Sequence, residues 1–453
     1  MPHFLDLFVE ELRGAKQELL RRVLTGEESN EVDRLLHQAF IEEWRDLPDP
    51  RKEELQVVAV DSGRALRRYS SGAFMYITRA IASSSWGKSY RNMMFNSHVV
   101  ASASPQIANM VGLRSEFCEH EAILDALNDS DDVDVVLVDG SLYGRINHVP
   151  EPFNYRGERD LYLRFMDTFS KLVERCRQRK ILLLGVSKDS IANHLTKFLM
   201  KRISQSILES LESELSSDQL TQLNDYLGSS VKNVRPLMNL IRDLPLNKQQ
   251  YENLLSLVSE LRRPRPDFSL ISAWAETSGY TTPIEPFPDV PLFKYEAKNP
   301  RDYALRRFAS ASADHPGEED AFEEWAVKVM EKVFGLPAFV TVCVKLSFQD
   351  TPLRIDVPAS TLGLPDRMTD LKEPKILDPP PDKLMQALAL LQAEYGGLDL
   401  YNVWLVQADQ EARLPERDVT NLYEPLIEKE LRISLSPLRR ERRARTAFRR
   451  SAR

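Results

Sequence analysis

The sequence contains few cysteines and no long apolar runs. Its three cysteines, Cys118, Cys176 and Cys343, lie far apart without CxxC spacing. This pattern excludes a disulfide framework and a cysteine zinc site, and it fits a reducing compartment. Apolar runs such as Ile181–Val186 are far shorter than the roughly 18 residues of a membrane span. The N-terminus reads as an amphipathic helix rather than a signal peptide. We therefore expect a soluble, cytoplasmic protein.

Glycine-rich and histidine-rich motifs are also missing. The chain has only 17 glycines and no GxxxxGK[ST] loop, so it is not itself a P-loop motor. Its seven histidines form no HExxH arrangement, which argues against a zinc protease. What the chain does have is 42% hydrophobic residues in a length of 453. That is enough for a sizeable core and about three domains.

The charge is unevenly distributed along the chain. The formal net charge is −8, yet the last stretch, RRERRARTAFRRSAR, carries eight arginines against one glutamate. Such a tail is either a solvated end or a salt-sensitive contact with nucleic acid or an acidic partner. Composition alone does not separate these two interpretations.

Hydrophobic periodicity predicts the order of the elements. Two N-terminal helices are followed by three consecutive strands, and then helices alternate with strands in the order βββαβαβα. The three strands are expected at 57–61, 73–82 and 97–104. The later elements are expected as helices at 113–127 and 161–177, a long helix from about 189, and strands at 133–141 and 180–187. This order predicts a ribonuclease H-like fold, an α/β mixed sheet flanked by helices.

The rest of the chain adds to this core. Residues 339–347 and 352–358 read as a hairpin, 383–395 as a helix, and 401–414 as a strand or loop running into a final helical segment. The predicted divisions are an N-terminal helical segment (1–50), the first part of the core (51–200), a helical insert (201–268), a C-terminal part that completes the core domain (269–435) and a basic tail (436–453).

Two aspartates end apolar strands of this predicted sheet. Asp61 follows VVAV and Asp139 follows VVLV, and a glycine comes soon after each. Either aspartate alone is more simply explained as a turn former. Together, at the carboxyl ends of neighbouring parallel strands, the two carboxylates would repel each other unless a cation lies between them. The pair therefore favours a divalent metal site.

Nearby residues could complete such a site. The helix between the two strands offers four carboxylates, Glu116, Glu119, Glu121 and Asp125, although most acidic residues on a helix are a solvated face. Lys188 stands just after the next strand, where a cation could hold a phosphate or could equally be a surface lysine.

The sequence resembles the NurA nucleases in the order of four short features. These are Asp61, the helix carboxylate, Asp139-Gly-Ser and Gly-Val-Ser-Lys188. The resemblance implies a ribonuclease H-like, manganese-dependent DNA nuclease that works with a hexameric HerA translocase in DNA end processing. It also implies a homodimer and selects Glu121, eighteen residues before Asp139, as the helix ligand. Manganese or magnesium would be held by Asp61, Glu121, Asp139 and a residue of the final motif.

That final motif departs from the family pattern. GLDLYNVWLVQADQEARL resembles Gly-Tyr-Pro-x-Pro-Leu-x-x-Ala-His, with Tyr401 in register and Asp409 at the histidine position. Aspartate remains a good oxygen ligand for these metals but is no imidazole. In the mechanism that we expect, Tyr401 would orient substrate or water, while Lys188 and Arg354 would contact DNA phosphates. Alternatively, Tyr401 is the buried aromatic of an alternating strand.

Two other functions stay open. The first is a catalytically degenerate adaptor on a HerA-like motor, supported by Asp409 and opposed by the intact acidic trio. The second is an actin-like phosphotransferase, which needs further glycine-rich loops; the only Gly-Gly pair, at 396–397, lies away from any strand-to-helix turn. An acidic nuclease also needs a partner or a local basic groove to approach DNA. The N-terminal helices and the arginine tail are candidate docking elements.

Overall fold

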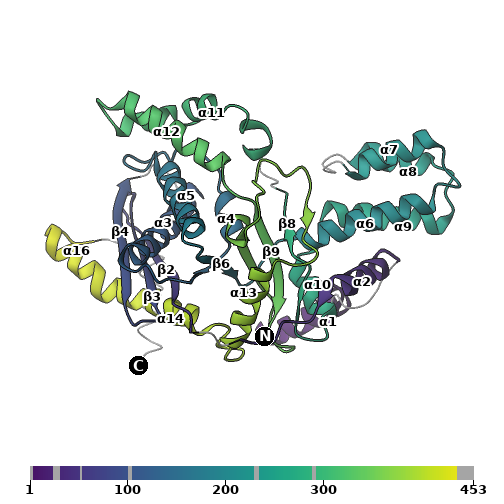
Figure 1. Ribbon diagram of the computed structural model, residues 1–453, viewed down its shortest axis with the longest axis horizontal. Coiled ribbons are helices and arrows are strands. Elements are labelled where there is room, and N and C mark those ends of the chain that lie inside the picture. The colour runs from purple at the N-terminus through teal and green to yellow at the C-terminus, as the bar shows by residue number, and fades with distance from the viewer. Residues whose placement is uncertain are drawn as a thin grey trace.

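The computed structural model describes residues 4–23, 31–51, 54–99, 105–228, 234–287 and 292–435. Within these ranges the strands form one mixed sheet, flanked by helices (Figure 1). The strands are β1 (Trp44–Arg45), β2 (Val57–Arg68), β3 (Ala73–Ser84), β4 (Ser89–Val99), β5 (Val135–Asp139), β6 (Leu182–Ser187), β7 (Gly279–Thr281), β8 (Ile284–Glu285), β9 (Phe339–Lys345), β10 (Leu353–Pro358) and β11 (Lys375–Ile376).

Helices account for most of the remaining chain. The first half contains α1 (Phe4–Val23), α2 (Glu31–Glu43), α3 (Pro105–Asp129), α4 (Leu142–Ile146), α5 (Leu161–Gln178), α6 (His194–Ser210) and α7 (Ser217–Gly228). The second half contains α8 (Val234–Asp243), α9 (Lys248–Arg262), α10 (Asp267–Trp274), α11 (Pro300–Phe308), α12 (Glu319–Phe334), α13 (Asp382–Ala393), α14 (Val403–Ala412), α15 (Glu416–Asp418) and α16 (Glu424–Leu431). None of the helices in the described ranges combines the length and apolar character that a bilayer span requires.

The strand order confirms the predicted fold. The main path through the sheet is β1-β7-β9-β10-β6-β5-β2-β3-β4. Strands β2, β3 and β4 are an antiparallel meander, while β5 runs parallel to β2 and β6 parallel to β5. The C-terminal hairpin β9–β10 adds to the edge of β6 in the antiparallel sense. Residues far beyond the first half of the chain therefore complete the same sheet.

The sequence placed some strands wrongly. Strand β2 does not end at Asp61 but continues to Arg68, because β3 stays paired with it after β5 has ended. The third strand is β4, Ser89–Val99, rather than 97–104; residues 100–104 lie outside the described residues. The side chains of β4 alternate between half-buried and exposed positions. The strand therefore lacks the continuous apolar run by which a fully buried strand is recognised in a sequence.

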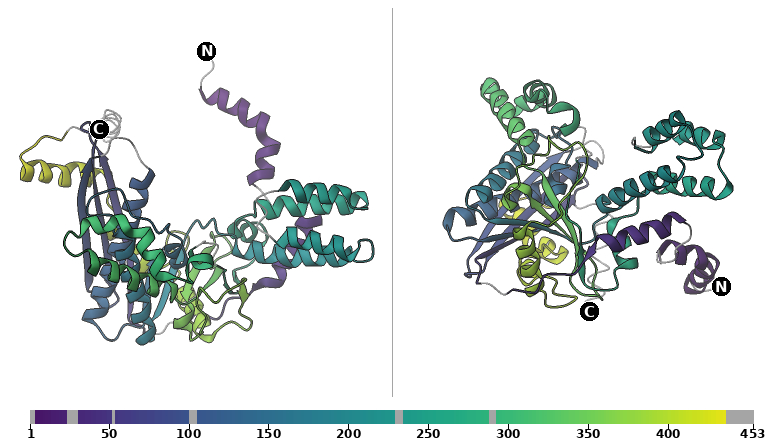
Figure 2. Two further views of the ribbon diagram at one scale, coloured as in Figure 1. Left: turned by 90° about the horizontal axis from the view of Figure 1, so that it is seen from above. Right: turned by 45° about the vertical axis from the view of Figure 1, so that its right-hand side comes forward.

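A helical arm projects from the sheet (Figures 1 and 2). Helices α6 to α9 form it, and they bury their own cluster of leucines and isoleucines together with α2 and α10. The arm begins within the stretch predicted to belong to the core, since α6 starts at His194. Helix α1 stands apart from the body, with Phe4 and Phe8 exposed (Figure 2).

The opposite faces of β2 carry different helices. Helix α3 packs on β2, β3 and β4, whereas α14 packs on β2, β3 and β5. Side chains alternate along a strand, so neighbouring residues of β2 point to different faces. A Cβ on Gly63 would meet the Ala412 carbonyl that ends α14, and Gly112 of α3 lies against Arg64. Asp61 shares its face with Gly63 and so faces α14.

Candidate active site

Asp61 and Asp139 lie next to each other on neighbouring strands. The parallel register of β2 and β5 pairs Val60 with Val138, and the two aspartates are the next residues of their strands. Paired strands are about 4.8 Å apart. The sequence-based expectation that the two carboxylates meet at one place in the sheet agrees with this register.

The Asp61 carboxylate is held in an unfavourable environment. Burial, followed by repulsion from Asp139, Glu119 and Asp409, raises the pKa of Asp61 to about 8. A hydrogen bond from the backbone N–H of Ser62 to Oδ1 at 2.7 Å opposes this rise. A carboxylate surrounded by other carboxylates gains from a bound cation, which relieves the repulsion.

Glycine is required at two positions in this region, once for its backbone conformation and once for a close approach. Gly140 follows Asp139 with a φ of 114°, a conformation that other residues rarely adopt. A Cβ on Gly63 would lie 2.2 Å from the carbonyl oxygen of Ala412, so only glycine lets α14 come so near to β2. Arg79 of β3 secures the same helix end by donating to the Ala412 carbonyl at 2.9 Å. These contacts bring Tyr401 and Asp409 to the aspartate pair.

Tyr401 and Lys188 both contact Asp139. The Tyr401 hydroxyl donates to Asp139 Oδ2 at 3.2 Å, and Lys188 Nζ lies 2.9 Å from the same oxygen. Lys188 also lies over the Tyr401 ring, 4.4 Å from its centroid. Burial and the nearby Asp139 raise the pKa of Tyr401, so the hydroxyl stays a proton donor. Two of the residues predicted from the sequence are thus in direct contact with a third.

Asp409 of α14 lies near Asp61 and Asp139, and these three residues are called the acidic cluster below. It raises the pKa of both Asp61 and Tyr401, and its own carboxylate pairs with Arg413 at 2.8 Å. The stretch around it was expected as a strand or loop, but it is a helix that begins after Asn402, whose side chain caps the N–H of Leu405. In this helix Val403 is exposed and Leu405 is buried, so the alternating-strand interpretation is wrong.

The α3 carboxylate associated with the cluster is Glu119 rather than Glu121. The Ser62 hydroxyl donates to Glu119, and Arg145 forms a buried ion pair with it. Glu119 is among the groups that raise the pKa of Asp61 most. Glu121 instead accepts a hydrogen bond from Asn92 at 3.1 Å. Residues two positions apart on an α-helix are separated by about 200° around its axis, so the side chains of Glu119 and Glu121 lie on different faces.

Arg354 lines an open cavity beside Asp139. This cavity has a volume of about 780 Å³ and is also lined by Lys188, Ser187 and Ser141. Arg354 is only 6% exposed, and its Nε donates to the buried Asp356 at 2.9 Å. Its Nη2 and the Ser187 hydroxyl have no hydrogen-bond partner in the described part of the chain. Unpaired buried donors beside a cavity are suited to an anion such as a phosphate.

The donors of the cluster fit a hard divalent cation. Asp61, Asp139 and Asp409 offer carboxylate oxygens, the ligands that manganese and magnesium prefer, and a bound cation would relieve the repulsion that helps to raise the pKa of Asp61. Among the described residues no three acidic, histidine or cysteine side chains are already gathered closely enough to form a ready-made metal site. Asp139 is engaged by Lys188 and Asp409 by Arg413, so side chains must rearrange to bind an ion.

Sequence reasoning missed several residues of this region. Ser62, Arg79 and Arg145 position the acidic side chains or α14, but each has an ordinary residue type in an ordinary context. Only Gly63, two residues after Asp61, carried a signal, and it was interpreted as part of a turn. Its role is the close approach of α14.

Comparisons with known proteins place this chain in a family. The family model of the NurA domain matches residues 55–414. The crystal structure of the NurA nuclease from Sulfolobus solfataricus is similar with a TM-score of 0.51 and 13% identity, over 95% of this chain and 98% of that one. A crystal structure of NurA has a TM-score of 0.43 and 16% identity, over 93% and 97% of the two chains. No curated protein matches the sequence. Because the family match covers most of its length, the chain belongs to the NurA family.

Proposed function

We propose that this protein is a divalent-metal-dependent DNA nuclease that hydrolyses phosphodiester bonds. The observation that carries the proposal is the pair Asp61 and Asp139, adjacent in register, with the pKa of Asp61 raised to about 8 by burial and by its acidic neighbours. Membership of the NurA family and the nuclease named among the similar structures support the same conclusion. They favour it over the actin-like phosphotransferase.

The metal would be held by Asp61, Asp139 and Asp409. Glu119, rather than Glu121, is the α3 carboxylate that would act on this site, through Ser62 and from the opposite face of β2. Manganese or magnesium suits these oxygen donors. When bound, such an ion would lower the pKa of a water molecule and neutralise charge on the phosphate. Glu119 is linked to the cluster through Ser62, so it also sets the charge that Asp61 experiences.

Other residues of the chain would position the DNA. Lys188 lines the cavity beside Asp139 and would contact a phosphate oxygen once a bound cation replaced it as the partner of that carboxylate. Arg354 offers its unpaired Nη2 to a second phosphate. Tyr401 would donate a hydrogen bond from its hydroxyl to an oxygen of the substrate or of the attacking water and so orient it. These contacts are to the backbone and carry no sequence preference.

Cleavage assays on end-labelled linear DNA test the proposal. Wild type should degrade the DNA with manganese or magnesium and lose this activity with a chelator. Asp61→Asn should lower the rate at least about 100-fold, equal to about 2.7 kcal/mol of transition-state stabilisation. The matched control is Asp125→Asn, an exposed carboxylate on α3, which should keep the wild-type rate. Circular dichroism must show both variants folded. Cleavage by Asp61→Asn at the wild-type rate would refute the assignment.

We further propose that the nuclease acts in the cytoplasm, in DNA end processing or in defence, as a homodimer on a HerA-like hexameric ATPase. This follows the family resemblance. The net charge of −8 supports the need for a partner that carries the DNA. The exposed apolar residues of α1 are the candidate docking surface, and they are Phe4, Leu5, Leu7, Phe8 and Leu12.

Co-purification tests the partner. The chain should elute with a HerA-like hexameric ATPase from the same organism, and the variant Phe4→Ser/Phe8→Ser should not. The co-purified complex of this chain and the HerA-like ATPase also tests the alternative that the chain is a catalytically degenerate adaptor. If the assembled complex is folded and complete but cleaves no DNA with either metal, the chain is an adaptor and the nuclease proposal fails.

A further inference from the structure

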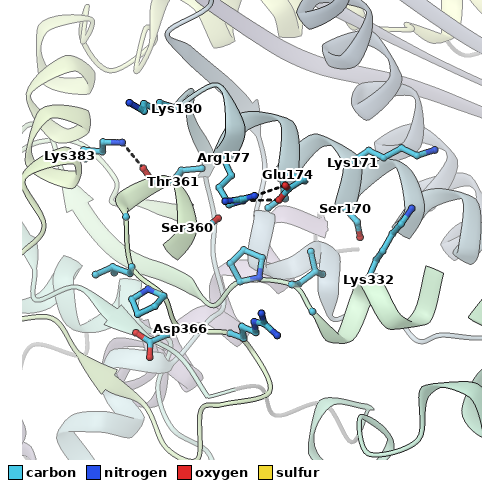
Figure 3. A pocket seen from close by; sticks show the side chains of 18 residues that line it. Ser170, Lys171, Glu174, Arg177, Lys180, Lys332, Ser360, Thr361, Asp366 and Lys383 are labelled. Carbon is cyan, nitrogen blue, oxygen red and sulfur yellow. Dashed lines mark hydrogen bonds and ion pairs between the residues drawn. The ribbon is translucent and has the colours of Figure 1, made fainter. Parts of the chain in front are cut away.

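Figure 3 shows a second large cavity and the residues that line it. It lies at the other end of β6 from Asp61 and Asp139. Its volume is about 1020 Å³. The walls come from the end of α5, the end of α12, the turn Ala359–Leu362 after β10, and the start of α13. Lys180 precedes β6, whereas Lys188 follows it, and the strand rises about 3.3 Å per residue. This cavity is therefore distinct from the one beside Asp139.

The lining is strongly cationic in an otherwise acidic chain. Six basic side chains face two carboxylates, Glu174 and Asp366. The basic side chains are Lys171, Arg177, Lys180, Lys332, Arg367 and Lys383. They come from several separate segments that the fold brings together. Cations at the end of α5 would complement the helix dipole, but that explanation does not extend to Lys332, Arg367 and Lys383.

Several polar groups of the cavity are not used by the fold. Lys171 and Lys332 both pair with Asp167, at 2.6 and 2.7 Å, and Arg177 pairs with Glu174. In contrast, the side chains of Lys180 and Arg367 make no ion pair or hydrogen bond with any described residue. The hydroxyl of Ser170, a residue only 7% exposed, also lacks a partner there, and so does that of Ser360.

Buried hydroxyls without partners are rare in folded proteins and call for an explanation. Here they lie among cations, in a space large enough for a small molecule. An anion with several oxygens would accept hydrogen bonds from Ser170 and Ser360 and meet the free charges of Lys180 and Arg367. The spread of the cations over separate segments suits a chain of phosphates better than a single one.

We propose that this cavity binds the oligophosphate chain of a small molecule, either a nucleoside triphosphate or an inorganic polyphosphate. Apolar side chains in the wall, such as Leu336 and Pro337, could additionally cover a base. No aromatic side chain lines the cavity among the described residues, so it lacks the stacking platform typical of single-stranded DNA sites. The inference does not depend on the proposed nuclease activity.

Isothermal titration of the full-length protein tests the proposal, with ATP, inorganic tripolyphosphate and adenosine as ligands at physiological salt in the presence of a chelator. ATP and tripolyphosphate should bind saturably, and adenosine should not. Equal affinities would identify the phosphate chain as the whole ligand, and tighter ATP binding would identify a nucleotide. Lys180→Gln/Arg367→Gln should weaken binding at least about tenfold, because both charges are otherwise unpaired.

The matched control removes two charges elsewhere. Arg301→Gln/Lys328→Gln changes exposed residues outside the cavity and should bind like wild type. Three results would each overturn the proposal: no saturable binding of either oligophosphate, equal weakening in the control, or binding of oligothymidylate alone. None of these measurements requires DNA cleavage, so the proposal can fail while the nuclease function stands.

Discussion

The hydroxyl of Tyr401 donates a hydrogen bond to Asp139 Oδ2 at 3.2 Å, although 262 residues separate the two in the sequence. This contact joins the C-terminal part of the chain to the centre of the sheet. It also places the Tyr401 ring against Lys188, whose Nζ lies 4.4 Å from the ring centroid. The tyrosine is thus the point where the final sequence motif meets the aspartate pair.

Replacing Tyr401 by phenylalanine should reduce cleavage about tenfold, since the ring stays in place and only the hydroxyl is lost. Stability should change by about 1 kcal/mol, the usual contribution of one hydrogen bond. Initial rates and thermal melting measure the two effects. Tyr395→Phe is the matched control, because Tyr395 also donates to a carboxylate, that of Asp350 at 2.9 Å. Equal rates for the two variants would leave Tyr401 with a packing role only.

The variants Glu119→Gln and Glu121→Gln test which carboxylate of α3 supports cleavage. The structure favours Glu119, and the sequence motif selects Glu121. We expect Glu119→Gln to lose at least about tenfold in cleavage rate, because the charge of Glu119 acts on Asp61 and raises its pKa. Glu121→Gln should keep the wild-type rate. Glu119 is buried against Arg145, so its replacement should also lower the melting temperature. Rates must therefore be compared well below both melting transitions. The reverse order of rates would restore the ligand selected by the sequence motif.

Metal affinity should depend on pH. In the metal-free protein the pKa of Asp61 is raised to about 8, so at lower pH its carboxyl group carries a proton that an incoming cation must displace. The apparent affinity for Mn²⁺ should then rise up to about tenfold per pH unit until pH reaches about 8, and level off above it. Electron paramagnetic resonance of free Mn²⁺ measures this directly. An affinity independent of pH would contradict the burial of charge at Asp61.

The stability at acidic pH should depend on Glu158. Burial alone would raise its pKa, but His98, Arg114 and Tyr76 together lower it to about 2. A lowered pKa means that the stabilisation is complete above the normal value of 4.5 and is lost as the pH falls toward 2. The shift corresponds to about 3 kcal/mol of unfolding free energy at neutral pH.

Thermal melting of Glu158→Gln tests this expectation. The variant should melt well below wild type at neutral pH, and the difference should shrink steadily as the pH falls from 4.5 toward 2. Glu174→Gln is a suitable control, because that glutamate pairs with Arg177 on the surface and should matter little. A constant difference at every pH would show that the lost packing, rather than the lost charge, destabilises the variant.

Sequence patterns were informative where structure is local. The apolar runs before Asp61 and Asp139 predicted two strands, and both strands lie in parallel register in the sheet. Likewise the helical spacing of 161–177 and 383–395 predicted α5 and α13. The length of β2 was underestimated, because a strand continues as long as a neighbour pairs with it, and pairing is not encoded in one segment alone.

The choice among the α3 carboxylates shows a different limit. Glu116, Glu119, Glu121 and Asp125 lie on one helix, and spacing to Asp139 does not say which side of that helix meets β2. The contact between Ser62 and Glu119 depends on how α3 rotates as it packs on the sheet. In the same way, the helical state of Val403–Ala412 depends on the cap from Asn402 and on packing against Gly63.

By itself the sequence determined the order of strands and helices, the family resemblance and the two aspartates of the sheet, because periodicity and short motifs are properties of neighbouring residues. Only the tertiary structure decided that Glu119 rather than Glu121 acts on Asp61, that Arg354 is buried with an unpaired nitrogen, and that Lys180 and Arg367 share a cavity. Each of these depends on which faces of distant segments pack together, and packing is settled by the whole core at once.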